Sequence, residues 1–127
     1  MPLKYRIEEN RKLIVSTAKG VVTFAEIKDH QDRLLSDADF HANFDQLIDV
    51  TTATDVALTA AHARIIADRQ IVSKESLRAF VASLPHIYGL GRMVEAFHET
   101  RAKAAVFYEM DAALDWLEIR VYGGIRG

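Results

Sequence analysis

Apolar and polar residues alternate at the start of the chain. Leu3, Tyr5 and Ile7 are separated by charged residues, which is the period of a half-buried strand, and a second apolar run covers residues 13–18. The two runs predict a β-hairpin.

The period becomes helical after this hairpin. Apolar residues between Phe24 and Leu35 recur every three or four positions, and Thr23 followed by Glu26 forms a capping-box pattern. We therefore expect a first helix over residues 24–35.

The rest of the chain repeats a strand-then-helix pattern three times. Strand-like apolar runs cover residues 47–50, 77–82 and 104–108, and each precedes an apolar stripe at helical spacing. The stripe positions are Leu58, Ala61, Ile65 and Val72, then Leu90, Met93, Val94 and Phe97, then Ala113, Leu114, Leu117 and Val121.

The predicted order of elements is ββαβαβαβα. Strands that alternate with helices pair in parallel through right-handed crossovers, whereas the opening hairpin is antiparallel. A chain of 127 residues can bury one sizeable core. We expect a single α/β domain over residues 1–127 with a mixed five-stranded sheet.

Five short segments spread over nearly the whole chain carry a family resemblance. They are Tyr5-Arg6-Ile7, Gly20-Val21-Val22-Thr23, Leu47-Ile48-Asp49, Tyr88-Gly89-Leu90-Gly91-Arg92-Met93 and Ala113-Leu114-Asp115-Trp116-Leu117. Together they resemble the bacterial SpoIIAA-like family, whose fold is similar to the STAS domains of anti-sigma-factor antagonists and to the lipid-binding CRAL-TRIO domains. Most members of this family have no assigned function, so the resemblance implies a fold and not an activity.

Composition excludes several classes of protein. The chain has no cysteine, so thiol catalysis, disulfides and cysteine-ligated metals are impossible. Its net charge of −2 offers no basic field for nucleic acid, and no apolar run is long enough to cross a bilayer. We expect a cytoplasmic protein that binds no nucleic acid.

Catalytic and metal motifs are missing as well. The sequence lacks a Gly-x-Ser-x-Gly elbow, a phosphate loop and a dinucleotide fingerprint. Residues 37–45 imitate a calcium loop, but Ala42 replaces its glycine and Ile48 its glutamate. The five histidines have no metal-ligand spacing and are expected to face solvent. We predict no cofactor and a non-enzymatic binding or regulatory module; an uncharacterised enzyme is the alternative.

A candidate ligand site follows from the rule that loops at the carboxyl ends of parallel strands line a crevice. The residues placed there are Thr51, Thr52, Thr54, His86, Tyr88, Gly89 and Arg92. Backbone N–H groups around Gly89, in front of a helix, and the Arg92 guanidinium would hold an anionic head group, with Tyr88 against an apolar tail. This arrangement suits a small amphipathic acid or a lipid. The structural alternative is that the glycines serve a turn and Arg92 pairs with Glu95.

Thr59 is the nearest hydroxyl to the position that a kinase modifies in STAS phosphoswitches. The corresponding stretch begins at Asp49 but contains no Ser-Gly pair. The resemblance therefore keeps an anti-sigma-factor antagonist or phosphoswitch open as an alternative, whereas ordinary cap preferences favour Thr59 as a helix cap.

Aromatic residues gather near the end of the chain. Tyr108, Trp116 and Tyr122 flank the last strand and helix, and small sheets with free edges often form symmetric dimers. We expect a homodimer, with Trp116 covering the protein's own core as the alternative.

Overall fold

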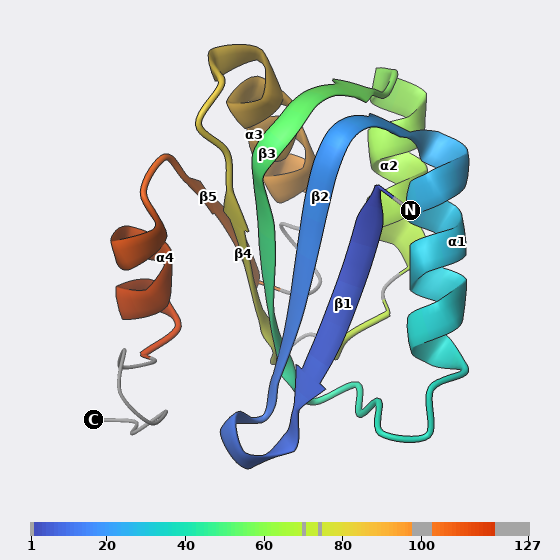
Figure 1. Ribbon diagram of the computed structural model, residues 1–127, viewed down its shortest axis with the longest axis vertical. Helices are drawn as coiled ribbons and strands as arrows, with labels where there is room; N and C mark the ends of the chain where they lie inside the picture. The colour runs from blue at the N-terminus through green and yellow to red at the C-terminus, as the bar shows by residue number, and fades with distance from the viewer. Residues whose placement is uncertain (1, 70, 74, 98–102, 119–127) are drawn as a thin grey trace.

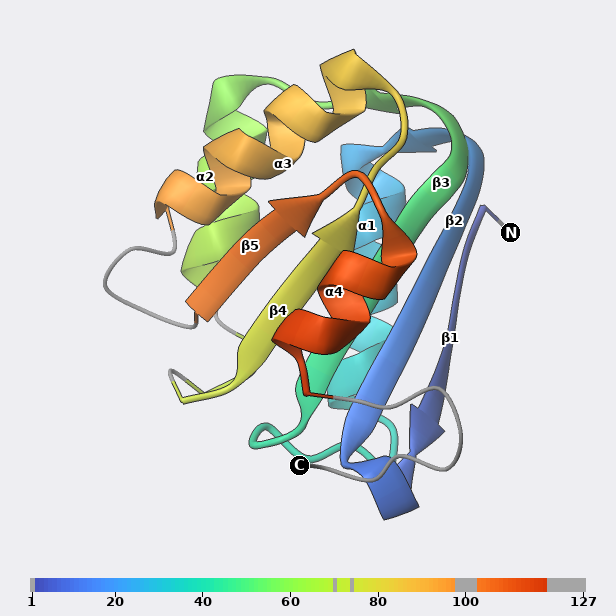
Figure 2. The ribbon, with the colours of Figure 1, turned by 90° about the vertical axis from the view of Figure 1, so that its left-hand side faces the viewer.

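A twisted five-stranded sheet with helices on both faces forms the protein (Figures 1 and 2). The computed structural model describes residues 2–69, 71–73, 75–97 and 103–118. Its elements are β1 (Leu3–Glu8), the 3-10 turn η1 (Glu9–Arg11), β2 (Leu13–Thr23), α1 (Phe24–Leu35), β3 (Asp45–Ala57), α2 (Ala60–Arg69), β4 (Leu77–Val81), α3 (Pro85–Phe97), β5 (Lys103–Phe107) and α4 (Met110–Trp116).

The strands lie in the sheet in the order in which they occur in the chain. β1 pairs antiparallel with β2, and every later pair is parallel. This confirms the predicted mixed sheet and the order ββαβαβαβα. The crossover helices α1, α2 and α3 cover one face, whereas α4 covers part of the other (Figure 2).

Local sequence determines α1 well. The Thr23 hydroxyl accepts a hydrogen bond from the Glu26 N–H at 3.3 Å, and the Glu26 carboxylate accepts one from the Thr23 N–H at 2.9 Å. This complete capping box satisfies backbone donors that the first helical turn leaves without partners. The predicted helix and its bounds are confirmed.

The strands β2 and β3 are longer than the apolar runs predicted. They continue to Thr23 and Ala57, and their pairing shifts register after Thr17 and again after Gly20. Gly20 has a φ of +64°, which glycine adopts without steric cost. Threonine fits a half-buried strand as well as valine does, so the threonines that follow Val50 extend the strand instead of forming a loop.

The apolar stripe predicted for α2 was wrong at Ala61 and Ile65, which are exposed. Ala63, Ile66 and Ala67 are the buried residues of this helix. Val72 is buried as expected, but it lies beyond the end of the helix at Arg69.

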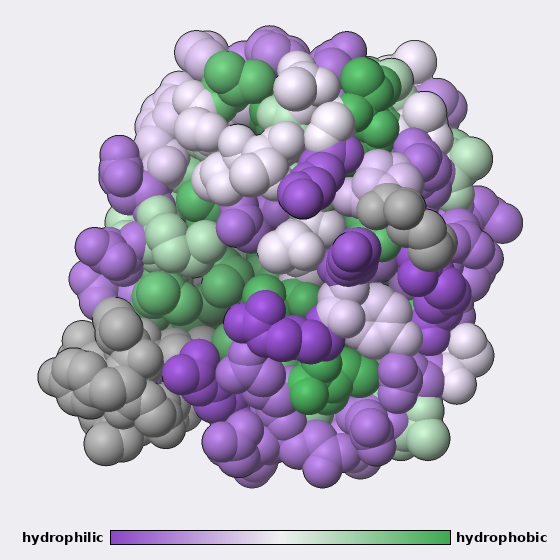
Figure 3. Space-filling view, viewed as in Figure 1, coloured by the Kyte–Doolittle hydropathy of each residue, from purple (hydrophilic) through white to green (hydrophobic). Residues whose placement is uncertain are grey.

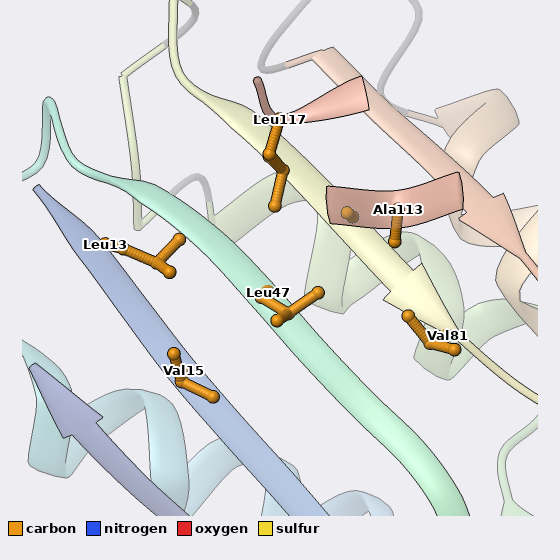
Figure 4. Packing of buried hydrophobic residues seen from close by; sticks show 7 residues of the cluster. Leu13, Val15, Leu47, Val81, Ala113 and Leu117 are labelled. Carbon is orange, nitrogen blue, oxygen red and sulfur yellow. The ribbon is translucent and has the colours of Figure 1, made fainter. Parts of the chain in front are cut away.

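One core layer lies between α4 and the sheet (Figure 4). Ala113 of α4 and Leu117, the residue that follows this helix, are fully buried against Leu13, Leu47 and Val81. Val121, predicted to continue this stripe, lies outside the described residues.

Trp116 packs at the border of the same layer. Its ring lies 5.7 Å from the ring of Phe107, so Trp116 covers the protein's own core, as the structural alternative expected. Tyr122 lies outside the described residues, and the homodimer stays a prediction.

Candidate functional site

A partly open cavity lies between the sheet and the helices α1, α2 and α3. Its volume is about 100 Å³. Alternating residues of the strands and the facing side chains of the helices make its walls almost entirely apolar. The apolar lining includes Ile27, Ile48, Val56, Leu58, Ile66, Phe80, Ile87, Leu90 and Val94.

A ladder of buried polar side chains forms one end of the cavity. The Arg78 Nε–H donates to Gln46 Oε1 at 3.1 Å, and the Gln46 amide donates to Ser16 Oγ at 3.1 Å. Ser16 Oγ lies 2.9 Å from His30 Nε2. The four residues come from β4, β3, β2 and α1, and each is less than 5% exposed.

The Ser16 hydroxyl links the amide of Gln46 to the ring of His30. Ser16 already accepts a hydrogen bond from Gln46, so its single hydroxyl proton is available for His30 Nε2. Burial, aided by the positive charges of Arg33 and Arg78, lowers the pKa of His30 to about 4, and the ring is neutral at pH 7. With Nε2 as the acceptor, the ring proton is on Nδ1.

Two buried atoms at this end have no hydrogen-bond partner. They are Nδ1 of His30 and Oε1 of Gln31, and both residues line the cavity. His30 is 4% exposed and Gln31 is 3% exposed. Buried polar atoms are almost always paired, so these two atoms point to a missing polar partner.

The expectation that the histidines face solvent was wrong for His30. A signal was present, because residues 30 and 31 follow Ile27 by three and four positions and precede Leu34 by four and three. They therefore continue the apolar stripe of the helix, where a side chain is buried whatever its polarity.

Arg78 is the second polar residue that the sequence did not indicate as functional. It shares the helix-covered face of β4 with Phe80, and its guanidinium carbon lies 5.5 Å from the centre of that ring. Burial lowers the pKa of Arg78 to about 10, so the group remains charged at pH 7.

The predicted anion cradle at Gly89 was wrong. The helix α3 begins at Pro85, which places Gly89 and Gly91 inside the helix instead of in front of it. Proline is favoured in the first helical turn because its missing N–H would have no partner there. Gly91 is required by packing, since a Cβ at this position would lie 2.7 Å from Val106 Cγ2.

Arg92 is an exposed residue of the same helix. Its Nε lies 3.8 Å from Glu95 Oε1, which confirms the predicted pairing of Arg92 with Glu95. The turn that the structural alternative expected at Gly89 and Gly91 was wrong, because both glycines lie within α3. Glu95 also accepts a hydrogen bond from the Val106 N–H at 3.0 Å.

The two segments predicted to form the ligand site do approach each other. The Ser83 hydroxyl donates to the Thr51 carbonyl at 3.3 Å, and His86 Nε2 lies 3.4 Å from Asp55 Oδ1. Tyr88 stacks on Tyr108 with ring centres 3.8 Å apart.

The threonine side chains at this site are engaged or exposed. The Thr51 hydroxyl donates to Asp49, the Thr52 hydroxyl donates to the Ala18 carbonyl, and Thr54 is exposed. None of the seven predicted site residues lines the cavity, and ligand binding by them stays a prediction.

Thr59 caps α2. Its hydroxyl accepts a hydrogen bond from the His62 N–H at 3.1 Å, while its own N–H donates to His62 Nδ1 at 3.3 Å. The cap interpretation is confirmed, and phosphorylation of Thr59 stays a prediction.

The calcium-like loop uses its first carboxylate within the protein. Asp37 accepts hydrogen bonds from the Tyr5 hydroxyl at 2.7 Å and from the Asp39 N–H at 2.9 Å. Across the part of the chain that the structure describes, His, Asp and Glu side chains form no group of three that could hold a metal ion. The same residues include no helix with the length and apolar character needed to cross a membrane.

A second hollow lies on the opposite face of the sheet, beside α4. Its floor is formed by Leu13, Val15 and Leu47, with Leu114 at one side. Figure 3 shows apolar side chains gathered in this region within an otherwise mostly hydrophilic face. The floor residues also form the core beneath α4, and the hollow is the flank of that core layer.

Comparison with solved structures decides the fold. One match is an uncharacterized protein from the DUF3478 family with a SpoIIAA-like fold, from Shewanella loihica PV-4. The two share 18% sequence identity over 91% of this chain and 93% of that one, with a TM-score of 0.62. This chain has a SpoIIAA-like fold. The fold expected from the sequence resemblance is confirmed.

Sequence comparisons add no further information about the SpoIIAA-like chain. No family model matches it, and no curated protein does. The function has to be argued from the cavity and its polar end.

Proposed function

We propose that this protein is a non-enzymatic binding module that holds a small, mostly apolar molecule in the cavity between the sheet and α1–α3. The observation that carries the proposal is a cavity of about 100 Å³ whose walls are apolar and whose polar end includes two unpartnered atoms. Protein interiors are close-packed, so an empty cavity of this size lowers the stability of the fold. A bound molecule that fills the cavity would remove this cost.

The volume limits the ligand. An engineered apolar cavity of roughly 150 Å³ holds benzene, and pockets for drug-sized ligands begin at roughly 300 Å³. The cavity of this protein is smaller than the benzene cavity but partly open, so one aromatic ring or a short branched chain is the largest body expected in it. A long-chain lipid would require the helices to move away from the sheet.

The placement of exposed and buried walls suggests an orientation for the ligand. Ile27, Val56, Leu58 and Leu90 are half-buried and lie near the carboxyl ends of the parallel strands. The polar ladder lies deeper, toward the amino ends of β3 and β4, where Gln46 and Arg78 are paired in register. We expect the apolar body of the ligand beneath the half-buried residues and its polar end at the ladder.

We also propose that the protein is not an enzyme and that it is located in the cytoplasm. Missing catalytic motifs favour a binding module over an enzyme, and a chain without cysteine suits the cytoplasm without requiring it. Turnover of an ester, phosphate or acyl substrate by the purified protein would overturn the non-enzymatic assignment.

Benzene provides the test of binding. Titration of the full chain, followed by the NMR shifts of its backbone amides, should give saturable changes at residues of α1, α3 and β4. Ala82→Leu fills the cavity because Ala82 is 1% exposed and belongs to its lining, so this variant should lose the response. Ala61→Leu is the matched control on the exposed side of α2 and should keep it. A folded wild-type protein that shows no saturable change would refute the proposal.

A further inference from the structure

The two unpartnered atoms come from neighbouring residues of α1. Nδ1 of His30 and Oε1 of Gln31 are each without a hydrogen-bond partner, and both side chains line the cavity. Both residues are more than nine-tenths buried and line the cavity, so the missing partners have to come from within the cavity. A ligand in the cavity is the natural source of those hydrogen bonds.

The two atoms differ in what they require. When the Ser16 hydroxyl donates to Nε2 of His30, the ring proton lies on Nδ1, and Nδ1 is then a donor that needs an acceptor. The carbonyl oxygen of the Gln31 amide is an acceptor and needs a donor. The polar end of the cavity thus offers one donor and one acceptor.

Common head groups satisfy this pair to different extents. A carboxylate would be attracted by the charge of Arg78, but it only accepts and would leave the Gln31 oxygen without a donor. An ammonium group only donates and would face both Arg78 and the proton on His30. A hydrocarbon satisfies neither atom. A hydroxyl group both donates and accepts through a single oxygen, so one small group supplies the two kinds of hydrogen bond that these atoms lack.

We infer that the ligand carries an uncharged hydroxyl group, which accepts a hydrogen bond from His30 Nδ1–H and donates one to Gln31 Oε1. This inference rests on the proposed function and adds the head-group class to it. The ligand is then a small alcohol or phenol with its apolar body against Ile66, Phe80 and Val94.

Phenol and toluene provide the test, since they have the same number of non-hydrogen atoms and differ in one group. Calorimetric or NMR titration of the full chain at pH 7 should give a Kd for phenol that is about tenfold lower than for toluene, as expected from two added hydrogen bonds to buried partners. Benzoate, measured in the same way, should bind more weakly than phenol.

A pair of variants separates the hydrogen bonds from the shape of the cavity. Gln31→Met removes the acceptor at similar volume and should reduce the preference for phenol to about twofold, because one hydrogen bond is lost and a polar group is buried. Ile65→Met is the control, since Ile65 is exposed on α2 and lies outside the cavity lining, so this variant should preserve the preference.

The outcomes are distinct. If toluene binds as tightly as phenol, or benzoate binds more tightly than phenol, the hydroxyl inference is wrong while the cavity remains a binding site. If neither phenol nor toluene binds, both the inference and the proposed function fail. Measurements on the unaltered protein decide these points even if Gln31→Met does not fold.

Discussion

Ser16 Oγ lies 2.9 Å from His30 Nε2, and this contact leaves Nδ1 as the ring nitrogen without a hydrogen-bond partner. Ser16 also accepts a hydrogen bond from Gln46, which in turn accepts one from Arg78. A chain of hydrogen bonds that all run in one direction polarises its members. The buried arginine at one end therefore strengthens the donor at His30 Nδ1 at the other.

This arrangement predicts a stability loss in weak acid. The unfolded chain protonates His30 with an ordinary pKa of 6.5, whereas the folded protein keeps the ring neutral to about pH 4. Acid therefore favours the unfolded state, and the free energy of unfolding should fall by about 3 kcal/mol between pH 6.5 and pH 4, with stability retained above pH 6.5. Urea unfolding at a series of pH values measures this loss.

His30→Gln is the control for this pH dependence. Glutamine can still accept the Ser16 hydrogen bond but does not titrate, so the variant should lose most of the change between pH 6.5 and pH 4. An unaltered pH profile in this variant would assign the acid sensitivity to other groups.

The two glycines of α3 predict opposite effects. Gly91→Ala places a Cβ 2.7 Å from Val106 Cγ2 and should destabilise the protein by about 1–3 kcal/mol, since α3 and β5 must separate. Gly89→Ala meets no atom within 4 Å and should stabilise the exposed helix by up to about 1 kcal/mol. Thermal unfolding of both variants measures the difference.

The assignment of this close contact has its own check. Gly91→Ala combined with Val106→Ala removes the branched side chain that the new Cβ meets, so the double variant should be more stable than the sum of the two single losses predicts. Additive losses would show that Gly91 is required for a different reason.

Features of the fold that depend on residues close together in the sequence could be predicted, whereas features that depend on distant segments could not. The capping box at Thr23 is made by residues three apart, so α1 was predicted with its correct bounds. The length of β3 depends instead on pairing with β2, a strand distant in sequence, and the polar threonines gave no sign of it. Element order was predictable because each apolar run is short and bounded.

The functional residues were harder to predict because burial of a polar side chain is decided by the tertiary structure. His30 and Arg78 occupy positions in apolar patterns, on α1 and β4, but their hydrogen-bond partners lie on other strands. The site predicted around Gly89 relied on a loop that the structure shows to be helix. The rule that loops at the carboxyl ends of parallel strands lie together correctly brought the two predicted segments close to each other. It gave no indication of the cavity between the sheet and the helices.

Val81 tests the core of the sheet. This side chain is fully buried beneath α4 in an apolar cluster, so Val81→Asp would bury a carboxylate among apolar side chains. We expect a loss of at least about 3 kcal/mol. Ile65→Asp at a half-exposed position of α2, four residues before Arg69, should cost less than about 1 kcal/mol. Equal melting temperatures for the two variants would contradict the placement of Val81.

Self-association is predicted from the edges of the sheet. β1 and β5 are the outer strands, and each has a side with no neighbouring strand among the described residues. Exposed strand edges tend to pair, so we expect a homodimer of the 14.3 kDa chain at micromolar concentration. Sedimentation that shows only the monomer mass would reject this expectation.

A crystal structure of the full chain with phenol can show the proposed ligand position itself. We expect electron density for one aromatic ring between the sheet and α1–α3, with its oxygen within hydrogen-bond distance of His30 Nδ1 and Gln31 Oε1. A cavity without phenol, or phenol bound only elsewhere on the protein, would show that this cavity is not the binding site.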